Sequence, residues 1–441
     1  MRSSFRSVTD VSEPRNVGLI SVAHGINEFY SIALPPIIPL LVTELDITLT
    51  QAGLLLTVFY AMYSIFQLPA GLLADRIGKK RLLVAGLVGM SGGILLAATA
   101  QSYEMLLLSQ ILAGISGSTY HPTGMSLISD LETADTEGRA MGIFGFGGMV
   151  GTAGAPAIVG GVAGILDWRL ALATAASAGL LGAALFFLLF EDTSNGREDR
   201  STDRHSNDRQ PDGGAEPPTS PGWKTGLRDA LSRVPTSPGQ LQAAIGVPLT
   251  ASIVLLVATT ILVSLQSRAI MTFTTSYLFV YTGESTALSN LGFLAMLVAG
   301  SLSSLWAGGL ADRFDRAWLG LAAALSTALL LGGTLVVGPL SGTVGQTPLL
   351  VILLGWFFLL GVAMYAIVPV KNAIISGVSE EEFSGSLFGV TQTGSALGST
   401  TGPALFGFLA ERTSIALAYP AIAAASVLLA LVFLALSRTL P

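Results

Sequence analysis

The chain has 441 residues, of which 51% are hydrophobic and only 11% are charged, and its formal net charge is -6. Soluble domains carry about 25% charged residues, so this composition excludes a water-soluble fold, and the negative charge argues against nucleic acid as a partner. Cysteine is absent, which excludes disulfides, thiol catalysis and zinc-thiolate or iron–sulfur sites. Because no metalloprotease, serine-nucleophile or phosphate-loop motif is present, we predict neither an enzyme nor a cofactor.

Apolar stretches long enough to cross a bilayer recur along the chain. A hydrocarbon core about 30 Å thick needs about 20 apolar residues per helix. The first stretch is expected to remain uncleaved, because the polar residues 1–16 precede an apolar run too long for a signal peptide. The twelve predicted spans cover residues 17–42, 51–74, 82–100, 104–129, 139–165, 168–190, 257–281, 286–310, 317–337, 348–370, 384–409 and 413–437.

A hydrophilic stretch separates the sixth and seventh spans. It holds 16 of the 50 charged residues and is rich in Asp, Arg, Ser, Pro and Gly, which predicts a disordered or partly helical linker. The predicted organisation is an N-terminal six-helix bundle (1–190), a cytoplasmic linker (191–242) and a C-terminal six-helix bundle (243–441). Lys and Arg are retained on the cytoplasmic side, and 19 of the 22 fall on the side of the linker and both termini. We therefore expect a multi-pass protein of the plasma membrane with cytoplasmic termini.

Three titratable residues occupy the first and fourth predicted spans. A charged side chain at the centre of a span costs about 2.5 to 3.5 kcal/mol, and Glu28 is the only carboxylate predicted deep in a span. His24 precedes it by one helical turn on the same face, and His121 has a similar predicted depth. Histidine titrates near neutral pH, so the three residues predict a proton relay. Alternatively, the histidines only satisfy backbone groups of their own bundle, and a metal site is not expected because a fourth ligand is lacking.

A short glycine–aspartate–arginine motif follows the second predicted span and recurs after the eighth. The two copies are Gly71-Leu-Leu-Ala-Asp75-Arg76-Ile-Gly78-Lys79 and Gly308-Gly-Leu-Ala-Asp312-Arg313. Recurrence at equivalent places in two halves indicates duplicated bundles, an architecture in which the substrate site lies between the repeats near the membrane midplane.

At this motif the sequence resembles the major facilitator superfamily, whose loop signature Gly-x-Leu-Ala-Asp-Arg-x-Gly-Arg-Lys is nearly complete at residues 71–81. The resemblance covers essentially the whole chain. It implies an all-α membrane protein with twelve transmembrane helices in two pseudo-symmetric six-helix bundles, around a cavity that opens alternately to each side. It also implies a gate, in which Asp75 faces the start of the eleventh span near Ser384 to Ser386, a contact worth about 0.3 to 2 kcal/mol.

Shorter motifs narrow the resemblance. His24-Gly-Ile-Asn-Glu28 and Tyr120-His-Pro122 resemble the fosmidomycin-resistance group of drug exporters. Small residues four apart, which let helices approach closely, line the fifth and eleventh spans. These stretches, which resemble the superfamily's antiporter motif, are Gly147-Gly-Met-Val-Gly151-Thr-Ala-Gly154-Ala-Pro156 and Gly394-Ser-Ala-Leu-Gly398-Ser-Thr-Thr-Gly402-Pro403. Ala155 replaces the central glycine in the fifth span, so the copy in the eleventh span is the closer match.

Arg268 falls near the middle of the seventh span, the pseudo-equivalent of the first. In a two-bundle fold these helices face each other, so we predict that Arg268 and Glu28 form a switchable pair or bind opposite ends of a substrate. A fixed ion pair that joins the halves is the alternative. Arg268 suits an anionic or zwitterionic substrate. Further substrate contacts are predicted at Asn27, Tyr30, Gln67 and Gln392.

These features predict a secondary active transporter that moves small organic solutes by alternating access, through proton-coupled efflux. One alternative is a proton-linked importer or facilitator of a metabolite, and another is a membrane sensor that does not transport. The predicted partners are a small-molecule substrate, protons and the lipid bilayer, and the predicted state is a monomer.

Overall fold

The computed structural model describes residues 11–133, 135–191, 250–378 and 384–439, which form helices and connecting turns without a strand. The predicted linker lies outside the described residues except for Glu191. The N-terminal helices are α1 (Pro14–Ser31), η1 (Pro35–Ile37), α2 (Ile38–Leu45), α3 (Leu49–Ile77), α4 (Lys79–Ala98), α5 (Tyr103–Gly117), α6 (Tyr120–Leu131), α7 (Glu137–Ala155), η2 (Pro156–Gly160), α8 (Gly161–Ile165) and α9 (Trp168–Leu189). The C-terminal helices are α13 (Ala251–Tyr281), α14 (Thr286–Ala311), α15 (Arg316–Val337), η3 (Gly338–Gly342), α16 (Gln346–Val378), α17 (Ser384–Arg412), α18 (Ile415–Ala421) and α19 (Ala423–Thr439).

The number of long apolar helices differs from the twelve spans that were predicted. In the described part of the chain, ten helices are long and apolar enough to cross a membrane. The predicted fourth span is instead divided at residues 118–119 into α5, with 15 residues, and α6, with 12. The predicted eleventh span corresponds to α17, which has 29 residues but is rich in Gly, Ser and Thr. The fourth span is therefore not among the ten because its helix is broken, and the eleventh is not among them because its helix is too polar.

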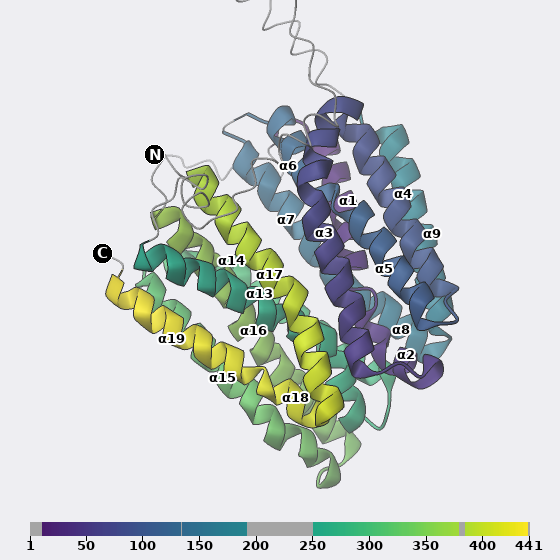
Figure 1. The fold of residues 1–441 in the computed structure, drawn as a ribbon, viewed down its shortest axis with the longest axis vertical. Coiled ribbons are helices and arrows are strands. Elements are labelled where there is room, and N and C mark those ends of the chain that lie inside the picture. The colour runs from purple at the N-terminus through teal and green to yellow at the C-terminus, as the bar shows by residue number, and fades with distance from the viewer. Residues whose placement is uncertain (1–10, 134, 192–249, 379–383, 440–441) are drawn as a thin grey trace, which may run out of the picture.

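The helices form two bundles, one from α1 to α9 and the other from α13 to α19 (Figure 1). Each bundle buries its own aromatic core, with Phe59 and Trp168 in the first and Tyr277 and Phe357 in the second. Within each bundle the first long helix packs closely against the fifth, since α1 contacts α7 as α13 contacts α17. The two halves thus repeat the same helix packing, as expected for a duplicated fold.

Glycines make the close pairing of these helices possible. Gly25 of α1 lies against the backbone of Gly147 and Gly151 of α7, and a Cβ on Gly151 would overlap the Gly25 carbonyl. In the other half, a Cβ on Gly398 or Gly402 of α17 would overlap backbone oxygens of α13. Only glycine allows two helix backbones to come this close, so a larger residue at these positions must push the helices apart.

The two bundles meet at the end of the molecule opposite to the termini. Thr57 Oγ1 of α3 donates to the Thr400 carbonyl of α17 at 2.7 Å, and Asn290 Nδ2 of α14 donates to the Pro36 carbonyl at 2.9 Å. Figure 1 shows that the ribbons of the two bundles diverge from this end toward the end that carries the N and C labels. The structure is therefore closed at the end far from the termini.

Two prolines mark this inter-bundle contact. Pro156 ends α7 and begins the π-helical turn η2, whose Gly160 lies against the Asn290 side chain. Pro403 lies inside α17, and its carbonyl lies against Gly53 of α3, where a Cβ would overlap it. Close backbone contact therefore joins the bundles here, together with buried side chains such as Ile32, which shares a core cluster with Phe273 of the other bundle.

At the end of the molecule that carries the termini, Glu132 joins the residues before α1 to the turn after α6 by hydrogen bonds. Its carboxylate accepts hydrogen bonds from the backbone N–H groups of Ser12 at 2.8 Å and Glu13 at 3.0 Å. Burial alone would raise the pKa of Glu132, but the hydrogen bonds from Thr136, Ser12 and Glu13 outweigh it and lower that pKa from its usual value. The carboxylate is therefore charged at neutral pH.

Candidate functional site

Three titratable side chains meet inside the N-terminal bundle. His24 and Glu28 project from the same face of α1, and His121 reaches them from the first turn of α6. The Glu28 Oε1 atom lies 3.8 Å from His24 Nε2 and 3.9 Å from His121 Nε2. The side chains of His24, Glu28 and His121 are 7%, 19% and 37% exposed, so the cluster is reached most easily from the His121 side. The structure thus brings together the three residues of the predicted relay.

The His24 ring is fixed by α7. Its Nδ1 lies 2.8 Å from the Phe144 carbonyl, and because a carbonyl only accepts hydrogen bonds, this nitrogen carries the proton. The ring stacks on the Phe144 ring with a centroid distance of 3.9 Å, and Gly148 leaves space beside it. The other nitrogen, Nε2, is buried and has no hydrogen-bond partner among the described residues. His24 therefore turns an unpartnered Nε2 toward Glu28.

A chain of hydrogen bonds fixes His121 in the same way. Asn27 Nδ2 donates to the Gly117 carbonyl at 3.1 Å, so Asn27 Oδ1 is free to accept from the Tyr63 hydroxyl at 3.2 Å. Since this hydroxyl donates to Asn27, it accepts from His121 Nδ1, which lies 2.5 Å away. The proton of His121 therefore resides on Nδ1, and its Nε2 also turns toward Glu28.

Arg268 approaches this region from the other bundle. Its Nη1 donates to the Tyr60 hydroxyl at 3.1 Å, and the guanidinium carbon lies 4.5 Å from the centre of the Tyr60 ring. Tyr60 donates in turn to the Ser31 carbonyl, at the end of the helix that carries Glu28. Arg268 and Glu28 are close enough to interact electrostatically, but they form no ion pair among the described residues. In this conformation Arg268 is therefore connected through Tyr60 to the end of α1 and is not paired with the Glu28 carboxylate.

The other predicted substrate residues are spread more widely. Asn27 belongs to the hydrogen-bond chain, Gln67 is partly exposed on α3, and Gln392 is exposed on α17. Tyr30 is buried on a different side of α1, where its hydroxyl donates to the Ala175 carbonyl of α9 at 2.8 Å. Tyr30 thus lies in the packing between α1 and α9 and not in the cluster around Glu28.

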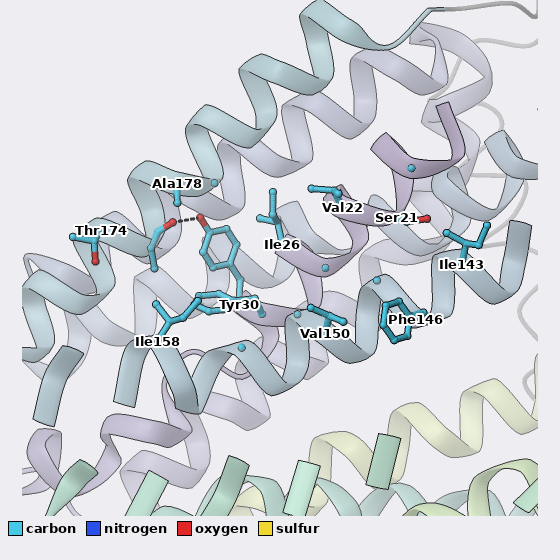
Figure 2. A pocket seen from close by; sticks show the side chains of 18 residues that line it. Ser21, Val22, Ile26, Tyr30, Ile143, Phe146, Val150, Ile158, Thr174 and Ala178 are labelled. Atoms are coloured by element: carbon cyan, nitrogen blue, oxygen red, sulfur yellow. Dashed lines mark hydrogen bonds between the residues drawn. The ribbon is translucent and has the colours of Figure 1, made fainter. Parts of the chain in front are cut away.

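Behind the cluster, a slot of about 820 Å³ opens between α7 and α9, with α1 as its floor. Figure 2 shows Val22, Ile26 and Tyr30 of α1 facing Phe146, Val150 and Ile158 of the neighbouring helix segment. Apolar side chains and glycines form nearly all of its lining. The slot is therefore separate from the polar cluster and is suited to hydrocarbon.

The loop-motif residues occupy the end with the termini. The Asp75 side chain lies outside the described residues, so its predicted contact with the start of α17 is not described. Gly78 has a φ of 90°, in the region that favours glycine, where the chain turns from α3 into α4. Arg76 is exposed, and Lys79 Nζ of α4 bonds to Asp130 Oδ2 of α6 at 2.5 Å. In the second copy, the side chains of Asp312 and Arg313 are exposed.

The sequence analysis missed the two α7 residues that hold His24, namely Phe144 and Gly148. The signal that was available is their position around the glycines that bring α7 onto α1, since Phe144 and Gly148 are four residues apart and therefore share the helix face that borders this contact. The hydrogen-bond acceptor itself is a backbone carbonyl, which no side-chain pattern reveals.

Comparison with known proteins identifies the family. The model of the Major Facilitator Superfamily matches residues 20–354 and 256–441, which together cover almost the whole chain. The chain belongs to the Major Facilitator Superfamily. The predicted family is thus confirmed.

Relatives match shorter stretches of this superfamily member. A probable L-galactonate transporter of Escherichia coli is 30% identical over 147 residues, which are 33% of this chain and 32% of that protein. Protein spinster homolog 1 of Bos taurus is 32% identical over 198 residues, covering 43% and 34%, and the fosmidomycin resistance protein of E. coli is 29% identical over 140 residues, covering 31% and 34%. These matches span about a third of each relative's length, and the drug exporter is one of several relatives.

Solved structures share the fold over the whole chain. A bacterial homolog of the human lysosomal transporter Spinster, in an inward-facing and unoccupied conformation, aligns with a TM-score of 0.73, 15% identity and 96% coverage of both chains. The nucleoside transporter NupG aligns with a TM-score of 0.69 and 14% identity, covering 96% of this chain and 100% of the other. Transport is named in the descriptions of the L-galactonate relative and of both solved structures, so this superfamily member shares a fold that membrane transporters use.

Proposed function

We propose that the protein is a proton-coupled secondary transporter that exports small organic anions or zwitterions by alternating access. The observation that carries this proposal is the meeting of the His24–Glu28–His121 cluster of one bundle with Arg268 of the other. A titratable carboxylate and a permanent cation that face each other across two rocking bundles allow protonation and substrate binding to act on the same conformational equilibrium.

The conformation supports alternating access. The bundles are in contact at the end far from the termini, through pairs such as Thr57 and Thr400. The distribution of Lys and Arg supports cytoplasmic termini. We therefore interpret the structure as a cytoplasm-open state of a plasma-membrane protein, an interpretation favoured by its similarity to the inward-facing structure of the Spinster homolog. Both bundles belong to one chain, so a monomer contains a complete transport unit.

Glu28 is the proposed proton carrier. Its Oε1 lies 3.8 and 3.9 Å from the Nε2 atoms of two imidazole rings, which can exchange a proton with it. Proton transfer needs heavy atoms about 2.6 to 3.2 Å apart, so a movement of under about 1 Å makes either ring a direct partner of Glu28. When Glu28 is protonated it loses its electrostatic attraction for Arg268. The two bundles are then free to separate at the depth of these two residues.

Arg268 is the proposed substrate anchor. One of its five N–H donors is used by Tyr60, and the planar fork of the guanidinium matches a carboxylate or phosphate group. In this mechanism protonation of Glu28 biases the bundles toward one opening, and a substrate anion on Arg268 biases them toward the other. Because proton and substrate favour opposite openings, the two fluxes are coupled in opposite directions.

The test uses proteoliposomes with an imposed pH gradient, in which internal pH is followed while organic anions, amphipathic drugs and neutral sugars are added. Wild type is expected to move protons only with a transported substrate, and Glu28→Gln should lose this movement while it still exchanges substrate for substrate. Glu104→Gln, which removes an exposed carboxylate at the start of α5, is the matched control. Substrate flux without proton movement in wild type would overturn the coupling, and unchanged anion affinity in Arg268→Ala would overturn the substrate role of Arg268.

A further inference from the structure

We propose that His24, Glu28 and His121 form a binding site for one divalent transition-metal ion, such as Zn²⁺ or Co²⁺. This inference goes beyond the proposed transport function and does not depend on proton coupling. It reverses the expectation from the sequence that no metal site is present, and it rests on how the structure orients the two imidazole rings.

The three donor atoms converge on one point. One ring nitrogen of each histidine and one Glu28 carboxylate oxygen lie within 4.8 Å of one another. Bonds of about 2.0 to 2.2 Å place two donors of one tetrahedral ion about 3.4 Å apart. The separations of 3.8 and 3.9 Å from Glu28 to the two rings exceed this by a few tenths of an ångström, and the separation between the two rings, up to 4.8 Å, needs a contraction of up to about 1.4 Å. His121 has 37% of its side chain exposed, so it has room for this movement.

The surroundings of the rings are those of metal ligands. A histidine that binds a metal usually donates its other ring N–H to a carbonyl or another acceptor, which fixes the tautomer and the ring orientation. His24 meets this condition through the Phe144 carbonyl, and His121 meets it through the Tyr63 hydroxyl. Both rings are therefore oriented with Nε2 toward the same carboxylate.

The buried Nε2 of His24 is the independent sign that a ligand belongs here. His24 is only 6% exposed, and its Nε2 has no hydrogen-bond partner among the described residues. A buried polar atom without a partner costs about 1 to 3 kcal/mol, and a metal ion at the centre of the cluster removes this cost. The Glu28 carboxylate likewise accepts no hydrogen bond in the described part of the chain, because Arg268 is held on Tyr60.

The donor set indicates the class of ion. Two imidazoles and one carboxylate suit Zn²⁺ and neighbouring first-row ions, and three protein ligands leave a coordination position open for water. Mg²⁺ and Ca²⁺ prefer oxygen donors and are not expected to bind with comparable strength. Occupancy would also engage the three groups of the proposed proton pathway, so bound metal should stop coupled transport.

The experiment titrates purified protein that carries no polyhistidine tag with Co²⁺, and it follows the visible absorption of the bound ion together with calorimetry. One equivalent should bind, and the signal should be lost in His24→Ala and His121→Ala. The chain has three histidines, so His205→Ala is the matched control and should bind as wild type does. Addition of Mg²⁺ should leave the Co²⁺ signal unchanged.

Tyr63→Phe tests the orientation of His121 without removal of a ligand. Loss of the hydroxyl that holds Nδ1 should weaken Co²⁺ binding by about 10- to 100-fold while the stoichiometry remains one. Glu28→Gln, which keeps the shape of the side chain, should also weaken binding, and it remains informative if a histidine variant does not fold. The proposal is overturned if wild type binds no stoichiometric Co²⁺, or if binding survives in both histidine variants. Failure of proton coupling with intact Co²⁺ binding would overturn the transport mechanism alone.

Discussion

Substitution of Gly53 by alanine should shift the protein away from the state described above. Gly53 of α3 lies against the Pro403 carbonyl of α17, and an added Cβ would overlap this oxygen. The oxygen belongs to one helix backbone and the added Cβ is bonded directly to the other, so neither can move aside as the end of a flexible side chain would. The two helices must therefore separate by roughly the extra radius of a methyl group whenever the far end is closed.

The size of the effect follows from the cost of overpacking. Forcing an extra methyl group into a close contact costs about 1 to 3 kcal/mol, and this cost is paid only in the state in which α3 and α17 touch. The ratio of the two states should therefore change by about 5- to 150-fold toward opening at the far end. Gly92→Ala is the matched control, because a Cβ at position 92 of α4 meets no atom within 4 Å.

Distances between spin labels provide the assay. The chain has no cysteine, so labels are introduced by cysteine substitution without a background signal. A pair at Gln101 and Thr413 reports on the far end, and a pair at Asp135 and Phe314 reports on the end with the termini. Gly53→Ala should lengthen the first distance and shorten the second. If the first distance is unchanged, or if Gly92→Ala lengthens it equally, the reasoning about this contact is wrong.

Two further substitutions test the packing of His24 and the hydrogen bonds that Glu132 accepts near the N-terminus. A Cβ on Gly148 would lie 2.6 Å from the His24 ring, so Gly148→Ala should displace His24 and reduce proton-coupled flux in proteoliposomes. Gly145→Ala is the control and should leave this flux unchanged, because a Cβ at position 145 meets no atom within 4 Å. Equal effects of the two substitutions would contradict the packing argument. Because the pKa of Glu132 is lowered from 4.5, its contribution to stability is complete above pH 4.5 and should disappear as the pH falls through the lowered pKa. The backbone amides of Ser12 and Glu13 should be protected from hydrogen exchange at pH 7, after correction for their intrinsic exchange rates. This protection should be lost once the pH falls below the lowered pKa of Glu132, or in Glu132→Gln. Unchanged protection would refute the role of Glu132 as their hydrogen-bond acceptor.

Sequence patterns predict the membrane helices well because hydrocarbon leaves a spanning backbone few alternatives. They fail where that constraint is relaxed. The division of the fourth span at residues 118–119 and the Gly, Ser and Thr of α17 depend on neighbouring helices that satisfy or cover the polar groups, and such neighbours are not visible in one segment of sequence.

The candidate site, too, could be predicted from the sequence only in part. His24 and Glu28 are one helical turn apart, so their shared face follows from the sequence alone. The contact with His121 depends on the relative depth of two helices, and the sequence predicted this depth only through the boundaries of the spans. Tyr30 shows the limit of that reasoning, because α1 has neighbours on several sides and a span boundary does not say which side a residue faces.

The apolar slot between α7 and α9 has a practical consequence for measurements on this protein. Its floor is the back of α1, the helix whose opposite side carries His24 and Glu28. In a membrane the slot is surrounded by lipid tails, and after extraction it is surrounded by detergent tails, which differ in length and branching. A detergent that fills the slot differently changes the support behind the titratable pair. Metal affinity and proton movement should therefore be compared between samples that share one lipid or detergent composition.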